Sequence, residues 1–387
     1  MKQLFQLNTA LIAILLLSYS SIFAQITLKV TVRSSDMLAG DQIYVAGDFN
    51  NWNPNSDEYR LEENENGFYS LSFYPSLGEH DFKFTKGSWS NVEVDKDGQD
   101  LGNRKFTYSG KPKQIELHIS NWKDARTTAV DPPKNVTIIS EDFDIPQLER
   151  SRRIWVYLPP DYDASNKSYP VLYMQDGQNL FDAATSYSEE WEIDESLNKM
   201  FQGGDQGVIV VGIDNGGSTR LDEYSPWVNS NYGGGEGASY VNFLVETLKP
   251  YIDSNFRTKP DRTNTGIMGS SMGGLISFYA AIERQDIFSK AGVFSPSFWF
   301  SDRVYDHVRT TGKNNDMRIV LLGGAKEGAG LVQNIDDMIK TLHKAGFGEP
   351  EIKRVILPDG AHSEWFWRRE FPESYMWLFN ENNLSQD

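Results

Sequence analysis

The chain has 387 residues, of which 39% are hydrophobic and 24% are charged, and its formal net charge is −17. This length exceeds what one hydrophobic core usually fills, so we expect two domains, and the composition is that of a globular protein rather than a disordered or fibrous one. The negative charge argues against a nucleic-acid or anionic-membrane partner, because phosphate groups would be repelled, and it favours a neutral or weakly charged substrate.

The first 24 residues have the layout of a secretory signal peptide. Lys2 precedes an apolar run from Leu11 to Leu17 that is too short to span a bilayer, and the small residue Ala24 stands before Gln25. A buried N-terminal helix is the alternative, and Ile22 fits poorly at its position before the cut. The chain has no cysteine, which excludes a lipid-anchored lipoprotein, disulfides and thiolate metal sites. We therefore expect residues 1–24 to be removed and the protein to be exported, to the periplasm or the exterior, without a membrane anchor.

Short runs of alternating polar and apolar residues fill the stretch from residue 25 to residue 123. Turn signals such as "NENG" and "DKDG" separate them, which is typical of a small β-sandwich. The polar, proline-containing stretch "TTAVDPPKN" follows, and we interpret residues 124–135 as a linker between two domains. The candidate strands are "ITLKVTV", "DQIYVAG", "GFYSLSF", "HDFKFTK" and "QIELHIS".

Residues 136–387 alternate continuous apolar runs with helical segments. Such a pattern predicts an α/β architecture in which a mostly parallel sheet is covered by helices on both faces. The helical segments include "GGLISFYAAIER" and "LVQNIDDMIKTLHKAG". The candidate strands are "RRIWVYL", "PVLYM", "GVIVVGI", "TGIM", "AGVF", "RIVLL" and "KRVIL".

The stretch "TGIMGSSMGG" lies between one of these strands and a helix. The pattern G-x-S-x-G fits it in one register, which makes Ser271 the candidate nucleophile between Gly269 and Gly273 and leaves Ser270 as a spacer. In α/β-hydrolases, small residues at such a turn allow a strained backbone that lifts the serine hydroxyl above the sheet. A glycine-rich turn without chemistry is the alternative.

A serine nucleophile needs a base and an orienting acid, which follow it in the order acid, then histidine, in this fold. Of five histidines, His362 comes after the last apolar run, where a loop would reach the carboxyl end of the sheet. Glu327 follows "RIVLLGGAK" at the same end of an earlier strand and is our candidate for the acid that accepts the imidazole N–H. Because the chain has 54 acidic residues, a solvated loop glutamate is the alternative, and Asp302 is the substitute acid. His307, in a polar segment, is the control histidine.

An oxyanion hole needs two backbone N–H groups. Met272, directly after the nucleophile, supplies one, and for the other we choose Gln178 in the loop after "YPVLYM". The aromatic stretches "SPSFWF" and "SEWFW" either line an acyl pocket, with Trp299 best placed to contact substrate, or belong to the core. We expect no cofactor and no metal, because "GGGEGA" follows a polar stretch instead of a strand and no P-loop or metal motif is present.

Residues from about 152 to 379 resemble the esterase D family of α/β-hydrolases, which contains feruloyl and acetylxylan esterases, enterobactin-type esterases and S-formylglutathione hydrolases. The resemblance implies Ser271 as nucleophile, His362 as base and Glu327 as acid. Many relatives have His-Gly where this chain has Asp176-Gly177, which loosens inference about the substrate. The matching stretches are "YPVLYMQDGQNLFD", "VIVVGIDNG", "RLDEYSPW", "GSSMGGLIS", "SPSFW", "LLGGAKEG" and "DGAHSEWFWRREFPE".

The N-terminal stretches "YVAGDFNNWNP", "GEHDFKFTKGSW" and "DLGNRKF" resemble the immunoglobulin-like modules that bind glycogen and starch beside carbohydrate-active enzymes. In such modules an exposed aromatic ring stacks on a sugar while polar groups bind its hydroxyls. The resemblance implies that Trp89, Lys83 and Asn103 bind carbohydrate, although such modules also serve as spacers.

Together these features predict an exported serine carboxylesterase in which a small β-sandwich precedes an α/β-hydrolase domain. We expect it to cleave a feruloyl or acetyl ester on a polysaccharide or oligosaccharide through an acyl-enzyme. One alternative is a siderophore trilactone esterase of the enterobactin type, and the other is a non-catalytic glycan-binding protein on a hydrolase scaffold. The sequence leaves the acyl group and the oligomeric state open.

Overall fold

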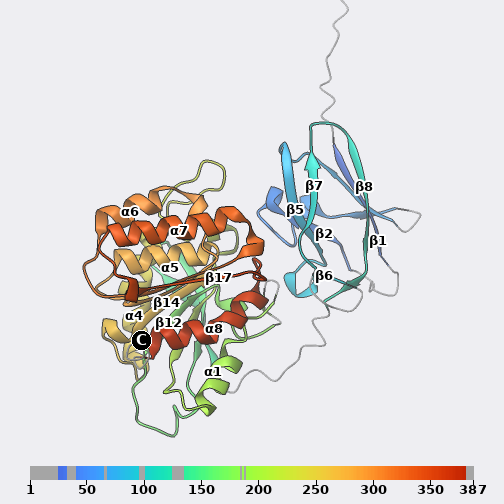
Figure 1. The fold of residues 1–387 in the computed structure, drawn as a ribbon. Coiled ribbons are helices and arrows are strands. Elements are labelled where there is room, and N and C mark those ends of the chain that lie inside the picture. The colour runs from blue at the N-terminus through green and yellow to red at the C-terminus, as the bar shows by residue number, and fades with distance from the viewer. Residues whose placement is uncertain are drawn as a thin grey trace, which may run out of the picture. The chain divides into compact units, whose positions relative to one another are not determined.

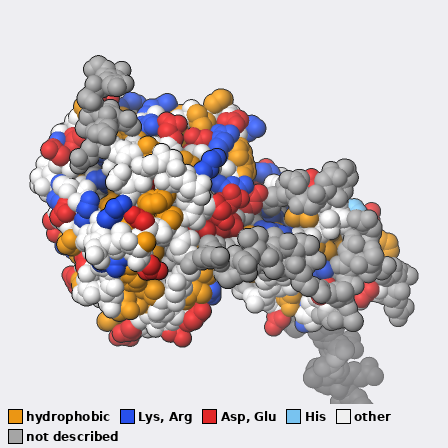
Figure 2. All heavy atoms as spheres, turned by 90° about the horizontal axis from the view of Figure 1, so that it is seen from below, with side chains coloured by type: hydrophobic (Ala, Val, Ile, Leu, Met, Phe, Trp, Pro, Cys, Tyr) orange, Lys and Arg blue, Asp and Glu red, His pale blue; other side chains and the backbone are white. Residues whose placement is uncertain are grey.

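The computed structural model describes residues 25–32, 41–64, 68–95, 101–123, 135–183, 185–186 and 189–380 (Figure 1). The predicted signal peptide, and all of the predicted linker except Asn135, lie outside the described residues. The chain divides into two compact units, one comprising residues up to Phe84 with Gly102–Ser120 and the other Thr85–Leu101 with Asn121–Asp387. Within the described residues, no helix combines the length and the apolar character needed to cross a bilayer. Acidic side chains form several groups among basic ones on the face drawn in Figure 2, in keeping with the net charge of −17.

The first unit is built from two β-sheets. Ile26, Leu28 and Val30 alternate along one strand and are fully buried, as the period of two in "ITLKVTV" predicts. The ring of Phe73 in one sheet contacts that of Phe106 in the other, with centroids 6.2 Å apart, so the sheets pack face to face. The four-stranded sheet has the order β3 (Glu62–Glu63), β4 (Tyr69–Phe73), β1 (Ile26–Val32), β8 (Lys113–Ile119), and the three-stranded sheet β2 (Tyr44–Gly47), β5 (Gly78–Thr85), β7 (Arg104–Tyr108).

The second unit is dominated by an eight-stranded mixed sheet. Neighbours from β13 to β17 in the sheet order are parallel, whereas β10, β11 and β13 pair antiparallel at one edge. A small sheet of β6 (Glu93–Val94) and β9 (Asn121–Trp122) also belongs to this unit. The order in the large sheet is β10 (Val136–Ile145), β11 (Arg150–Tyr157), β13 (Ile209–Ile213), β12 (Val171–Gln175), β14 (Thr265–Ser270), β15 (Lys290–Phe294), β16 (Arg318–Gly324), β17 (Ile352–Leu357).

Helices cover both faces of this sheet, with α5, α6 and α7 on one face and α1 and α8 on the other (Figure 1). On β12, Leu172 and Met174 pack with α1 and α8, whereas Val171 and Tyr173 pack with the helices of the opposite face. Both faces of the strands are thus apolar, which confirms the predicted α/β class. The helices are α1 (Ile193–Gln202), α2 (Arg220–Glu223), α3 (Gly237–Asn242), α4 (Lys249–Asn255), α5 (Met272–Glu283), α6 (Arg303–Thr311), α7 (Ala329–Lys344) and α8 (Glu364–Phe379), and a π-helical segment, Phe243–Leu248, joins α3 to α4.

The carboxyl ends of the parallel strands lie along the same side of the sheet, and the connections that follow these strands carry the predicted site residues. Gln178 follows β12, Ser271 follows β14 and Trp299 follows β15. Glu327 follows β16 and His362 follows β17. In open α/β sheets this carboxyl edge is where ligands bind, so the topology gathers residues that are far apart in the chain.

Candidate active site

The turn between β14 and α5 holds Ser271 in a sparsely populated conformation, with φ 58° and ψ −122°. A Cβ atom on Gly269 would come within 2.6 Å of the Gly273 carbonyl oxygen, and one on Gly273 within 3.0 Å of Asp176 Oδ2. The Ser271 N–H donates to the Phe294 carbonyl at 2.9 Å, which ties the turn to the neighbouring strand. Glycine on both sides of the serine is therefore a steric requirement of this turn.

Ser271, His362 and Glu327 form a continuous hydrogen-bonded relay. Ser271 Oγ lies 3.0 Å from His362 Nε2, and His362 Nδ1 lies 2.6 Å from Glu327 Oε2. When Nδ1–H donates to the carboxylate, Nε2 is left to accept the serine proton. The Glu327 side chain is 3% exposed and the His362 side chain 47% exposed, so the acid is shielded while the imidazole is open to solvent. This is the arrangement that proton transfer from a serine hydroxyl needs.

A second set of donors holds Glu327 in place. Its Oε1 accepts the Gly324 N–H and the Ser295 hydroxyl, both at 2.7 Å. Trp367 Nε1 donates to Ser295 Oγ at 2.9 Å, and the Trp367 ring lies edge-on to the His362 imidazole with centroids 5.1 Å apart. Sequence reasoning missed the roles of Ser295 and Trp367, and their place within the aromatic stretches "SPSFWF" and "SEWFW" was the one signal that pointed to them.

The loops that carry the acid and the base touch each other. The Lys326 N–H donates to the Gly360 carbonyl at 3.0 Å. A Cβ atom on Gly324 would lie 2.2 Å from the Gly360 backbone, so the two loops approach so closely that only glycine fits at position 324. This contact brings the end of β16 and the loop after β17 together and so sets the reach of Glu327 to His362.

Other candidate groups take no part in this relay. Asp302 is exposed directly before α6, so Glu327, and not the substitute acid, is the carboxylate that contacts the base. The control histidine, His307, packs against the rings of Trp227 and Tyr279, and burial lowers its pKa. Among the described residues, three carboxylates outside the relay are close enough to hold a metal ion together: Glu190, Asp194 and Glu195.

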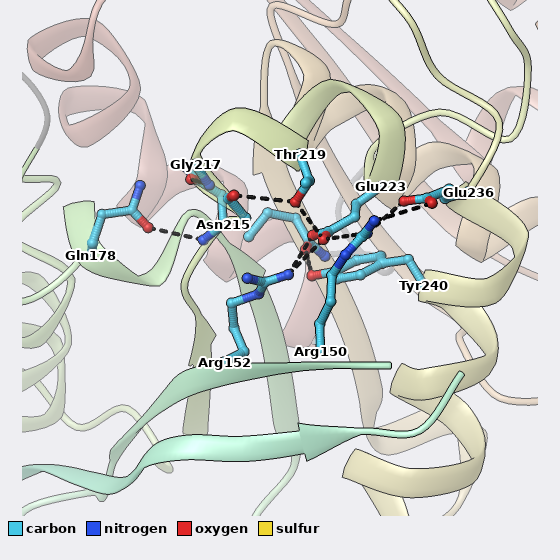
Figure 3. Close-up of polar contacts among 11 residues, drawn as sticks. Arg150, Arg152, Gln178, Asn215, Gly217, Thr219, Glu223, Glu236 and Tyr240 are labelled. Atoms are coloured by element: carbon cyan, nitrogen blue, oxygen red, sulfur yellow. Dashed lines mark hydrogen bonds and ion pairs between the residues drawn. The ribbon is translucent and has the colours of Figure 1, made fainter. Parts of the chain in front are cut away.

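Both predicted oxyanion residues lie at neighbouring strand ends. Met272 is the first residue of α5, where the N–H has no acceptor within the helix, and Gln178 lies in the turn directly after β12, which pairs with β14. The turn after β12 is clamped, because Asp176 accepts two bonds from Arg220 at 2.7 and 2.8 Å and one from Asn215 at 2.7 Å. The Asn215 N–H also donates to Gln178 Oε1 at 3.2 Å, as Figure 3 shows.

A buried charge network anchors the connection after β13 to the neighbouring strand β11. Glu223 is fully buried and accepts bonds from Arg150, Arg152 and Thr219 at 2.6 to 2.9 Å (Figure 3). Arg150 also pairs with Glu236, which directly precedes α3. Because three side chains donate to the buried Glu223 carboxylate, the cost of burying its charge is compensated. The connection after β13 is therefore held in place next to the turn after β12.

Trp299 has an exposed ring and lies two residues after Ser297, which contacts Ser271. It is 56% exposed, and its ring meets that of Tyr232, itself 46% exposed, edge-to-face with centroids 5.6 Å apart. The nearby Ser297 donates its N–H to the Ser271 carbonyl at 3.0 Å, and its hydroxyl lies 3.4 Å from Ser271 Oγ. This exposure excludes the core alternative for Trp299, and its contact with substrate stays a prediction.

The residues implied to bind carbohydrate are placed differently from the expectation. Trp89 is 9% exposed and Lys83 is 6% exposed, so neither offers the open surface that sugar binding requires. Asn103 is exposed. Trp89 lies in the turn Trp89–Asn91 and Lys83 on β5, where both are less accessible than the resemblance implies, and their role in carbohydrate binding stays a prediction.

Comparison with known proteins bears on the second unit. The model of a family described as "Putative esterase" matches residues 145–375. The uncharacterized protein YbbA of Bacillus subtilis is 25% identical over 245 residues, which are 60% of this chain and 94% of YbbA. An "Endo-1,4-beta-xylanase/feruloyl esterase" of Xylanibacter ruminicola is 25% identical over 219 residues, which are 55% of this chain but only 27% of that protein. The crystal structure of the enterobactin esterase of Shigella flexneri matches with a TM-score of 0.53 at 16% identity, covering 87% of this chain and 88% of that one, which shows a shared fold.

Proposed function

Because the chain belongs to this esterase family and is a carboxylic ester hydrolase, we propose that it works through a serine acyl-enzyme with Ser271 as the nucleophile. The observation that carries this proposal is the relay from Ser271 to His362 to Glu327, at 3.0 and 2.6 Å. An intact relay also argues against a non-catalytic glycan-binding protein, which would be expected to have lost one of its members.

In the proposed reaction Ser271 Oγ attacks the ester carbonyl while its proton passes to His362 Nε2. Glu327 stays ionised and stabilises the imidazolium, and the N–H groups of Met272 and Gln178 bind the oxyanion of the tetrahedral intermediate. His362 then returns the proton to the departing alcohol, which leaves an acyl-serine. Water attacks the acyl group with His362 as base, and the acid product leaves as Ser271 regains its proton.

We propose a carbohydrate-linked ester, feruloyl or acetyl, as the substrate. The Xylanibacter relative, whose name includes feruloyl esterase, supports this choice. The exposed rings of Trp299 and Tyr232 support it as well, because flat aromatic surfaces suit a hydroxycinnamoyl group or the face of a sugar and Trp299 follows the segment of Ser297, which contacts Ser271. An uncharged ester also avoids repulsion by a chain with a net charge of −17.

We further propose that residues 1–24 direct export and that residues 25–123 form a module that brings the esterase to a polysaccharide. The support for export is the signal-like layout of the first residues, and the support for the module is its two-sheet sandwich beside an esterase. With Trp89 and Lys83 buried, carbohydrate binding by this module would fall to other exposed groups, such as Asn103 and the ring of Tyr74, which is 57% exposed.

A siderophore trilactone esterase is the second candidate. The observation that favours it is the fold shared with the enterobactin esterase of Shigella flexneri over 87% of this chain, a span that includes more than the hydrolase unit. A panel of aryl acetates, acetylated sugars, methyl hydroxycinnamates and a catecholate trilactone separates the two. The highest kcat/KM on the trilactone would replace the carbohydrate proposal.

The nucleophile is tested by Ser271→Ala with Ser270→Ala as the matched control. Ser270 is the last residue of β14 and is buried, so its loss removes a hydroxyl of the same size one residue away. We expect Ser271→Ala to lower kcat by a factor on the order of 10⁶, as loss of a serine nucleophile does elsewhere, and Ser270→Ala to keep most of the activity. Equal losses in both variants would remove the assignment.

A further inference from the structure

The segment that leads into α1 carries an excess of negative charge. It contains five carboxylates in seven residues, and one cation on α8, Arg368, reaches it. Arg368 pairs with Glu192 at 3.1 Å and Glu189 at 3.6 Å, and it also donates to the Glu190 carbonyl at 2.9 Å. Within the described part of the chain, Arg368 forms its ion pairs with Glu189 and Glu192, and the other three carboxylates of the segment have no ion pair there.

The three carboxylates that Arg368 does not pair with are Glu190, Asp194 and Glu195. One oxygen of each lies within 4.8 Å of the others, and among the described residues none of the three forms an ion pair with a basic side chain. Asp194 is 1% exposed and its Oδ1 has no hydrogen-bond partner, and Glu190 Oε1 is likewise buried without one. Buried oxygens without donors are costly to a folded protein, which points to a ligand that supplies positive charge at this place.

We propose that Glu190, Asp194 and Glu195 bind a hard divalent cation of the calcium type. The donor set consists of carboxylate oxygens alone, which such cations prefer, whereas zinc and copper sites draw on imidazole or thiolate. Calcium accepts irregular geometry and completes its shell with water or carbonyl oxygens, which suits three carboxylates from one loop and the first turn of α1.

The cation would also stabilise the aromatic packing that supports the catalytic residues. Trp191, next to Glu190 in the chain, stacks on Phe294 with centroids 5.6 Å apart and meets Trp367 at 5.6 Å. Trp367 is the side chain that donates to Ser295 beneath the catalytic acid. A cation that holds residues 190–195 in place would therefore also hold Trp367, whose indole N–H donates to the Ser295 hydroxyl that in turn donates to Glu327.

Thermal unfolding of the full-length protein after treatment with a chelator, with and without CaCl₂, tests the site. At about 100 times the Kd we expect a rise in Tm of roughly 5 to 10 °C. Asp194→Asn and Glu190→Gln keep the shape and remove a buried charge, so both should fold and both should lose the rise. Asp337→Asn, which alters an exposed carboxylate on α7, is the matched control and should keep it. No rise in the wild type, or an equal rise in Asp194→Asn, would overturn the proposal.

Terbium luminescence locates the ion, because Tb³⁺ replaces Ca²⁺ and is excited through a nearby tryptophan. With Trp191 inside the segment, we expect emission that saturates at one Tb³⁺ per chain, is displaced by Ca²⁺ and is lost in Asp194→Asn. MgCl₂ should displace Tb³⁺ far less well, since Mg²⁺ demands octahedral geometry and sheds water reluctantly. Emission that Asp194→Asn leaves unchanged would place the ion elsewhere and refute the site.

Discussion

Glu327→Gln is expected to remove most of the activity for a reason that the structure makes specific. Glu327 Oε1 accepts two donors, the Gly324 N–H and the Ser295 hydroxyl, so the amide oxygen of a glutamine must take that position. The amide NH₂ then faces His362 Nδ1, where the carboxylate oxygen had been at 2.6 Å. To avoid a clash of two donors, Nδ1 must accept, which moves the ring proton to Nε2 and leaves no acceptor for the serine proton.

The size of the loss follows from this change of tautomer. Replacing the orienting carboxylate of a serine triad by its amide lowers kcat by about 10⁴, or about 5.4 kcal/mol of transition-state stabilisation. Ser295→Ala removes one donor but keeps the carboxylate, so we expect a much smaller loss, on the order of tenfold, from looser positioning. The assay is kcat on one small soluble ester at saturation, with circular dichroism to check that each variant is folded.

Asp302→Asn is the matched control, because it makes the same chemical change at the exposed residue before α6. Its kcat should stay near that of the wild type. Near-normal kcat in Glu327→Gln would refute the tautomer argument. Collapse in Asp302→Asn would move the acid to the connection after β15.

Three further outcomes are expected. A chain that starts at Asn135, whose side chain donates to the Leu158 carbonyl at 2.8 Å, should keep kcat on a small soluble ester and lose activity on insoluble polysaccharide. A folded but inactive product would show that residues before Asn135 contribute to the site. Trp299→Ala and Tyr232→Ala should each lower kcat/KM on a methyl hydroxycinnamate by about 2- to 12-fold with little change on an aryl acetate, whereas Tyr251→Ala, another exposed aromatic residue, should change neither. Burial raises the pKa of Asp214 to about 6, so the wild type should lose stability as the pH rises from about 4 to about 6, whereas Asp214→Asn should not. Denaturant titration should show the variant gaining up to about 3 kcal/mol relative to the wild type over this range, and parallel stability curves for the two proteins would contradict the prediction.

The relay could be predicted from the sequence because a position in the chain translates directly into a position in this fold. Ser271, Glu327 and His362 each follow an apolar run, and parallel strands bring the residues after such runs to one edge. The choice of Glu327 over Asp302 rested on the same argument, and the hydrogen bond to His362 agrees with it.

The supports of the relay could not be predicted, because they depend on side chains that meet only after folding. Trp367 reaches Ser295 across 72 residues, and Arg220 reaches Asp176 across 44. The buried state of Trp89 is a property of packing, and no local pattern distinguishes it from an exposed ring.

The antiparallel edge and the carboxylate cluster escaped sequence reasoning for related reasons. The run "RRIWVYL" is as apolar as the parallel strands, so its direction in the sheet could not be inferred from its composition. Glu190, Asp194 and Glu195 do not follow the ligand spacing of an EF-hand loop, and their convergence depends on how the chain enters α1.

The chemistry and the rim of the site are carried by different connections of the fold. The relay belongs to the connections after β14, β16 and β17, whereas Tyr232 belongs to the one between α2 and α3. That connection is joined to the segment of Trp299 through Asn229, which donates to the Phe300 carbonyl at 2.8 Å. Exchanging residues 228–235 for a loop of another length, with Asn229 retained, is therefore a route by which evolution or an engineer can alter which esters are accepted while the hydrolytic machinery is inherited unchanged.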